Sequence, residues 1–191
     1  MKKIMVLLLA VCMLASCGED TATVSSGLEV YTGSGYMVQI PSTWTVVTDH
    51  SSVLPKPSNG DIELAVTSNE TQNGFANNLL VLSQEMSTPT SSKEYSIVNN
   101  VGAEREYLNY TKLDTKDFTY SDGDAGLMYV FTAKYSESAP ELTYIQTAKV
   151  CGATTGYFMT IALPLSTVDT AKYEAILKTF WCREESLGEE G

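Results

Sequence analysis

The chain has 191 residues, 43% of them hydrophobic, and its formal net charge at pH 7 is −11. This length and apolar content are enough for one ordinary domain with a buried core. The excess of acidic residues repels nucleic-acid phosphates and anionic lipid headgroups, so we expect neither as a partner. The charge by itself indicates no ligand.

The first 16 residues have the features of a secretory signal peptide. Lys2 and Lys3 form a positive start, and an uninterrupted apolar run over residues 4–14 follows. This run is shorter than the roughly 20 apolar residues that a membrane-spanning helix needs. We therefore expect residues 1–16 to be removed, and Cys12 with them.

The segment Leu14-Ala15-Ser16-Cys17 resembles the bacterial lipobox. The resemblance implies that Cys17 carries a thioether-linked diacylglycerol, becomes the first residue after cleavage and anchors the chain to a membrane. Firm anchoring takes more than one acyl chain, because each buried CH₂ contributes only about 0.8 kcal/mol. Gly18 is not the Asp that resembles an inner-membrane retention signal, so the choice of membrane stays open. The alternative is an ordinary signal peptide that leaves Cys17 as a thiol.

Residues 17–34 are mostly small and polar, which predicts a flexible tether behind the lipidated cysteine. The acidic end over residues 184–191 is predicted to be disordered. Between them, residues 35–183 form a single predicted domain. Alternating apolar residues over 36–40 predict its first strand, which Pro41 ends. Further strands are predicted in three segments: TWTVVT, IELAVTS and NNLLVLSQEM.

Residues 91–108 are predicted to form a helix. Ser91 and Glu94 match a capping box, in which each side chain bonds the backbone of the other residue. Its buried face is expected to carry four apolar side chains: Tyr95, Val98, Val101 and Leu108. A second helix is predicted from Val168 to Cys182, with Ser166 as its cap. This helix has one apolar stripe: Tyr173, Ile176, Leu177 and Phe180.

Four segments between these helices are rich in aromatic and β-branched residues: KLDTKDFTY, GLMYVFTAKY, ELTYIQTAKV and GYFMTIAL. Short turn-forming sequences separate them, whereas a parallel crossover needs about a dozen residues or more. The sequence therefore predicts an antiparallel meander. Together with the two helices, this meander defines an α+β domain with a mostly antiparallel sheet.

Cys151 and Cys182 are the only cysteines of the predicted domain. A strand of roughly 26 Å leads away from Cys151 and a helix of roughly 21 Å leads back, at about 3.3 and 1.5 Å per residue. In an exported protein this geometry predicts a Cys151–Cys182 disulfide. A reactive or metal-binding pair is the alternative, but zinc normally takes four ligands and no histidine lies nearby in the sequence.

The order of four segments resembles the PsbP-like family: VQIPSTW, NNLLVLSQEM, SSKEY and KYEAILKTF. That family includes the extrinsic photosystem protein and many small bacterial lipoproteins. The resemblance covers residues 35–182 and implies an antiparallel sheet with helices on both faces. It also implies a binding or assembly role without a reaction. It carries over no functional residue. The Cys151–Cys182 pair is not part of the pattern that this family shares.

The sequence offers no catalytic constellation. His50 is the single histidine and no GxSxG motif is present, so we interpret His50 as an exposed loop residue rather than a catalytic base. Asp122 and Asp124 could suggest calcium, but the further ligands of an EF-hand are missing, which favours a β-turn. We therefore expect no cofactor and no bound metal.

Tyrosines recur on the predicted strands, at Tyr129, Tyr135, Tyr144 and Tyr157. Most are expected to pack beneath helices. The alternative is that some of them line an open groove for an apolar or sugar ligand.

Three hypotheses for the function follow. The leading one is a non-catalytic, lipid-anchored protein of the bacterial cell envelope that binds or assembles with another envelope protein. The second is a carrier that holds a small apolar ligand in a cavity between helix and sheet. An envelope hydrolase has the least support, because the sequence shows no nucleophile, base or metal set.

Overall fold

The computed structural model describes residues 27–50, 54, 57, 60–72, 74–152 and 154–183. The predicted signal peptide, the lipidation site Cys17 and the predicted acidic tail therefore lie outside the described residues. The part that the structure describes folds into two antiparallel sheets with helices packed on them.

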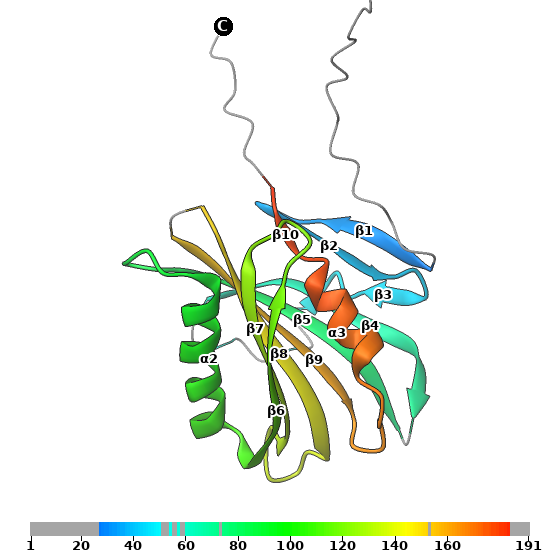
Figure 1. Ribbon diagram of the computed structural model, residues 1–191. Helices are drawn as coiled ribbons and strands as arrows, with labels where there is room; N and C mark the ends of the chain where they lie inside the picture. Colours follow the sequence, from blue (N-terminus) through cyan, green and yellow to red (C-terminus); the bar gives the residue numbers. More distant parts are fainter. Residues whose placement is uncertain are drawn as a thin grey trace, which may run out of the picture.

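The larger sheet has seven strands. They are β3 (Trp44–Val46), β4 (Asp61–Gln72), β5 (Phe75–Glu85), β6 (Leu108–Thr119), β7 (Ala125–Lys134), β8 (Glu141–Cys151) and β9 (Thr155–Pro164). Their order across the sheet is β3-β4-β5-β9-β8-β7-β6, and every neighbouring pair is antiparallel (Figure 1). The strands from β6 to β9 are consecutive in both chain and sheet, which confirms the predicted meander.

The smaller sheet has three strands, in the order β1-β2-β10. They are β1 (Leu28–Thr32), β2 (Tyr36–Pro41) and β10 (Trp181–Cys182). Strand β1 corrects the prediction that residues 17–34 are all tether. Its five residues pair with β2, which satisfies the backbone groups that face β2, and Tyr31 of β1 packs against the core.

Alternate residues of the large sheet face two different layers. Helix α2 (Ser92–Glu106) covers one face, and helix α3 (Ala171–Lys178) covers the other together with the small sheet (Figure 1). On β8, for example, Tyr144 packs in the cluster that contains Ala103 of α2. The next residue, Ile145, packs in the cluster that contains Leu177 of α3. The fold is therefore α+β, as predicted.

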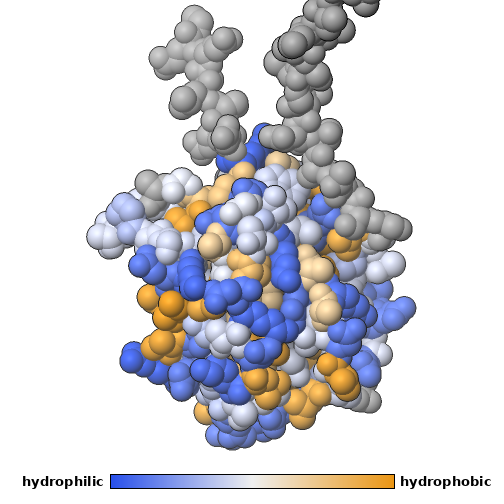
Figure 2. Space-filling model, in the orientation of Figure 1, coloured by the Kyte–Doolittle hydropathy of each residue, from blue (hydrophilic) through white to orange (hydrophobic). Residues whose placement is uncertain are grey.

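Helix α2 has the predicted capping box, but of the four residues predicted for its buried face only Tyr95 is buried within the helix. Val98 is 67% exposed and Val101 is 42% exposed, while Leu108 begins β6. The buried residues are mostly small or polar: Ser92, Tyr95, Ser96, Asn100 and Ala103. Ser92 and Ser96 are buried because they bond backbone groups that the sheet beneath them leaves without a strand partner, as described below. Apolar side chains of the outer face form a cluster on the surface (Figure 2).

Helix α3 is shorter than predicted. It begins after Thr170, whose side chain makes no capping hydrogen bond, and Ser166 and Val168 lie in the loop before it. The predicted stripe is nevertheless buried: Tyr173, Ile176, Leu177 and Phe180. Phe180 follows the helix and stacks on Tyr36 of β2, with ring centroids 4.9 Å apart. Within the described residues, no helix has the length and apolar character required to cross a bilayer.

The structure contains the Cys151–Cys182 disulfide that the sequence predicted. It joins the end of β8 in the large sheet to β10 in the small sheet, 31 residues further along the chain. Such a bond persists in an oxidising compartment. Strand β10 pairs with β2, and Cys182 packs against the core.

Candidate functional site

A groove of about 570 Å³ opens where α3 meets the β1–β2 hairpin and the edge formed by β3 and β4. Figure 1 shows α3 beside these strands. Its floor is apolar: Leu28, Pro41, Trp44, Tyr173 and Ile176. Its rim is polar: Thr43, Ser68, Asn69, Glu70, Asn77 and Lys172. An apolar floor with a few placed polar groups is typical of ligand sites.

Two aromatic rings dominate the floor. The ring centroids of Trp44 and Tyr173 are 6.4 Å apart and the planes meet at 38°. Trp44 is fixed by the pairing of β3 with β4, where it lies opposite Ser68. Tyr173 is 6% exposed, and its hydroxyl accepts a hydrogen bond from the Asn77 amide at 2.7 Å. The Tyr173 ring is therefore already ordered before a ligand arrives, and it supports the neighbouring Trp44 ring.

The rim of the groove presents both donors and acceptors. The Asn69 carbonyl oxygen accepts a hydrogen bond from the Thr45 hydroxyl at 2.6 Å, which orients the amide. The Glu70 N–H donates to the Ser68 hydroxyl at 3.1 Å. Lys172 lies with its Nζ 4.8 Å from the centre of the Tyr173 ring. The single Glu and the single Lys of the lining balance in charge.

A shallower pocket of about 250 Å³ lies on the same face of the sheet, at the loop between β9 and α3. Exposed Leu113, Leu165 and Val168 line it. On one side Lys116 Nζ lies 2.7 Å from the carboxylate of Glu174. Burial alone raises the pKa of Glu174, but hydrogen bonds from Lys116 and Thr170 outweigh it and hold this pKa below its usual value.

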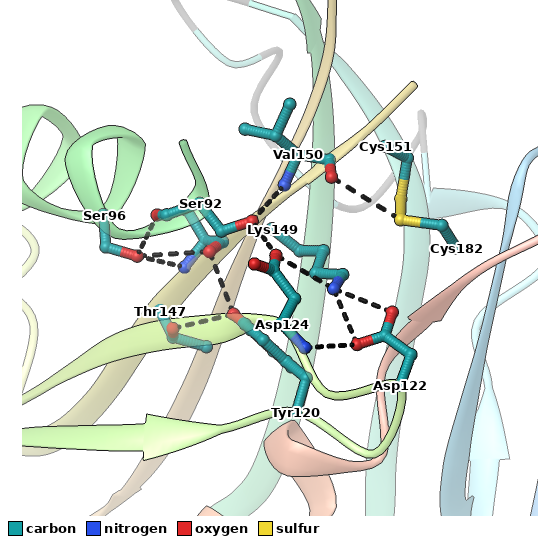
Figure 3. A network of polar contacts seen from close by, with 11 residues as sticks. Ser92, Ser96, Tyr120, Asp122, Asp124, Thr147, Lys149, Val150, Cys151 and Cys182 are labelled. Atoms are coloured by element: carbon teal, nitrogen blue, oxygen red, sulfur yellow. Dashed lines mark hydrogen bonds and ion pairs between the residues drawn. A yellow bond between two sulfur atoms is a disulfide. The ribbon is translucent and has the colours of Figure 1, made fainter. Parts of the chain in front are cut away.

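The large sheet opens between β7 and β8, and a polar network fills the opening (Figure 3). Pairing of the two strands ends at Tyr129 and Gln146. Beyond that point the Ser96 hydroxyl accepts from the Ala148 N–H, and the Ser92 hydroxyl accepts from the Val150 N–H, each at 2.9 Å. The side chains of α2 thus replace a strand partner, which explains its polar buried face.

Lys149 lies in the same network and is 2% exposed. Its Nζ is 2.7 Å from Asp122 and 3.0 Å from Asp124, and 4.6 Å from the centre of the Tyr120 ring. Burial raises the pKa of Asp124, but hydrogen bonds from Ser92 and Lys149 outweigh it and leave this pKa lowered. The network ties the β6–β7 turn to β8 and to the start of α2, so we interpret it as structural.

The predicted β-turn at Asp122 and Asp124 is present, and their carboxylates face Lys149 rather than an open calcium site. Among the residues that the structure describes, no three Asp, Glu, His or Cys side chains converge on a metal position. His50 is half-buried, so the prediction of an exposed side chain is wrong. Its carbonyl accepts a hydrogen bond from the Leu54 N–H at 2.8 Å.

The tyrosines expected on strands are mostly core residues. Tyr129, Tyr144 and Tyr157 are buried, whereas Tyr135 follows the end of β7 and is 61% exposed. None of them lines the groove. From the sequence, Tyr173 was predicted as part of the apolar stripe of the second helix, and Trp44 entered only in the segments TWTVVT and VQIPSTW, with no role in binding. Trp44 is one of two tryptophans of the chain and lies in a predicted strand, which does not distinguish a groove residue from a core residue.

Neither a protein-family model nor a curated protein sequence matches the chain. Solved structures resemble it weakly. A protein of unknown function, PA94, from Pseudomonas aeruginosa is 12% identical, with a TM-score of 0.44 over 79% of this chain and 91% of that chain. A protein from Bacteroides thetaiotaomicron VPI-5482 is 9% identical, with a TM-score of 0.40 over 83% of this chain and 49% of that chain. Likenesses this weak identify neither a family nor a function.

Proposed function

We propose that the protein is a lipid-anchored binding module of the bacterial cell envelope, with no catalytic role, which recognises another envelope component in the groove beside α3. The observation that carries this proposal is the pair of fixed aromatic rings, Trp44 and Tyr173, at the floor of a groove with a polar rim. Aromatic floors with oriented amides recognise ligands, and their groups stack and hydrogen-bond without having to react.

The envelope location rests on the sequence of the amino terminus and on the disulfide. The lipobox at Cys17 supports a lipid anchor, and the Cys151–Cys182 bond is of the kind that forms outside the reducing cytosol. The resemblance to the PsbP-like family agrees with helices on both faces of an antiparallel sheet. We propose membership of that family on the segments quoted above.

The carrier hypothesis has less support from the packing. An apolar ligand between α3 and the sheet would need space that side chains already fill. Met159 of β9, Leu177 of α3 and Phe180, which follows α3, are each 0% exposed in the core. The open groove has a polar rim, which suits a ligand that is itself partly polar.

The indole NMR signals of the two tryptophans test the groove directly. Trp44 lies in the groove, and Trp181 lies on β10 outside it. Soluble extracts of the bacterial envelope are added to the full-length chain in mild detergent. We expect the Trp44 indole N–H signal to shift while the Trp181 signal stays in place. If periplasmic, cell-wall and membrane extracts all leave Trp44 unshifted, the groove does not bind an envelope component.

Metabolic labelling with an alkyne fatty acid tests the anchor. The wild-type chain is expected to take up the label and to sediment with membranes, and Cys17→Ser is expected to do neither. Cys12→Ser is the matched control, because this cysteine lies inside the apolar run that precedes the lipobox. A wild-type chain that takes up no label would contradict the lipid anchor and leave the groove proposal intact.

A further inference from the structure

We propose that the ligand of the groove is a carbohydrate, namely an uncharged chain of pyranose units. This inference rests on the proposed binding function and names the ligand class of the same site. It follows from three properties of the groove: the two rings of its floor, the mixed donors and acceptors of its rim, and its balance of charge.

The floor suits the faces of sugar rings. A pyranose presents a flat patch of C–H groups whose hydrogens are slightly positive, and the face of an aromatic ring is negative. Trp44 is half-buried and is the ring on which a sugar can stack. Tyr173 is 6% exposed, lies under Lys172 and supports the indole at an angle of 38°. Leu28, Pro41 and Ile176 extend the apolar surface along the groove.

The rim suits sugar hydroxyls, each of which donates and accepts. Asn69 and Asn77 are amides, which offer both kinds of group, and each is oriented by a hydrogen bond within the protein. Glu70 adds acceptors on the solvent side, and Thr43 and Ser68 add hydroxyls. Fixed polar groups above a stacking floor are the combination that recognises polar rings rather than aliphatic chains.

The charge of the protein favours an uncharged polymer over the polyanions of a cell envelope. The chain carries a formal charge of −11, and Lys172 is the one cation in the lining. A polyanion would meet repulsion that a single exposed lysine cannot offset. A proline-rich peptide also packs on aromatic grooves, so a peptide ligand is the outcome that the test must be able to reveal.

The decisive experiment treats the active envelope extract before it is added to the full-length chain. One portion is oxidised with periodate, which cleaves the vicinal diols of sugars, then quenched and dialysed. Another portion is digested with proteinase K and heated to inactivate the enzyme. The readout is the Trp44 indole signal, with Trp181 as internal control. Loss of the Trp44 shift after periodate supports the inference, and loss of the shift after proteinase K but not after periodate overturns it.

Variants locate the binding. In calorimetric titrations with the dialysed polysaccharide fraction, Trp44→Ala is expected to bind about tenfold more weakly or worse. Trp181→Ala is the matched control, since it removes the same side chain outside the groove, and we expect its affinity to be unchanged. Asn69→Ala tests an exposed rim residue without touching the core, and about threefold weaker binding is expected. Equal affinities for wild type, Trp44→Ala and Asn69→Ala would overturn the inference.

The two proposals fail in different ways. If no extract shifts Trp44, the groove does not bind and the proposed function itself fails. If an extract shifts Trp44 and periodate has no effect while proteinase K abolishes the shift, the binding function stands. In that case the ligand is a peptide, and the carbohydrate inference alone is overturned.

Discussion

Lys149 is a buried ammonium on β8, and the groups around it explain why it is tolerated. Two carboxylates and the face of Tyr120 surround it, and the carboxylates of Asp122 and Asp124 remain 30% and 42% exposed. The Lys149 ammonium is therefore desolvated, whereas the carboxylates that pair with it remain partly hydrated. An ion pair of this kind fixes a turn more than it adds stability.

Replacing this lysine by a side chain of similar length should destabilise the domain. We expect Lys149→Met to lower the free energy of unfolding by about 2 kcal/mol, because the pairing is lost while much of the apolar packing stays. The matched control is Lys93→Met, whose partner Asp117 is 75% exposed. That change should alter the free energy by less than about 0.5 kcal/mol. Urea unfolding measures both, and equal effects would refute a structural role for Lys149.

Acid should destabilise the domain through the carboxyls with lowered pKa, Glu174 and Asp124. Because their pKa is lower in the folded state than in the unfolded chain, their contribution is complete above the unfolded values of about 4. It is lost as the pH falls through the folded values. We expect the free energy of unfolding of the wild type to decline below about pH 4, and that of Glu174→Gln to decline less steeply with falling pH. Identical slopes for wild type and variant would contradict this assignment.

Sequence patterns predict a structural feature well when the residues that determine it are close together in the chain. The Asp122 and Asp124 turn was predictable because turn chemistry acts within a few residues. Its partner was not, since Lys149 lies 27 residues from Asp122 and looks in the sequence like any strand lysine. The rings of the groove were missed for the same reason. Trp44 and Tyr173 meet only after the whole sheet has formed.

At the scale of elements, the disulfide holds two sheets together at the end of the chain. Strand β10 has only two residues, so its pairing with β2 is too short to be stable alone. The Cys151–Cys182 bond fixes it to β8. The close packing of Phe180 against Tyr36 depends on this closure, because Phe180 directly precedes β10.

Removal of the disulfide should therefore cost a large part of the stability. A loop of 31 residues predicts a loss of about 3 to 4 kcal/mol for the double variant Cys151→Ala, Cys182→Ala. Urea unfolding of wild type with and without reductant measures the same quantity. The two methods should agree, and a loss below about 1 kcal/mol would mean that β10 is held by its packing alone.

The helices show where element-level prediction ends. The capping box of α2 was readable because it is contained in four residues. Its buried face could not be predicted in the same way. Ser92 and Ser96 are buried because they bond β8 where β7 no longer pairs with it, and hydrophobic periodicity detects only apolar burial. The stripe of α3 was predicted correctly because it packs on an apolar face. Hydrophobic patterning thus failed where the sheet itself is interrupted.

At the scale of the whole molecule, the groove exists because the two sheets do not close on each other. Helix α3 and the small sheet cover the same face of the large sheet, and the groove lies where α3, the β1–β2 hairpin and the edge strands β3 and β4 meet. Its lining comes from segments between residues 28 and 176. No local motif indicates a site whose lining comes from such distant segments. The α+β class of the fold in which it forms was predictable from the order of strands and helices.

The net charge of the molecule makes one further prediction about binding. A chain of formal charge −11 interacts with charged ligands through a field that salt screens, whose range falls from about 10 Å at 0.1 M to about 3 Å at 1 M. An uncharged carbohydrate does not feel this field. We therefore expect its affinity in the groove to change by less than about twofold between about 0.05 and 0.5 M sodium chloride. Calorimetric titration of the polysaccharide fraction at both salt concentrations measures this. If the affinity falls about tenfold with rising salt, the ligand is cationic, because screening weakens attraction. If the affinity rises by a comparable factor, the ligand is anionic, because screening then removes repulsion.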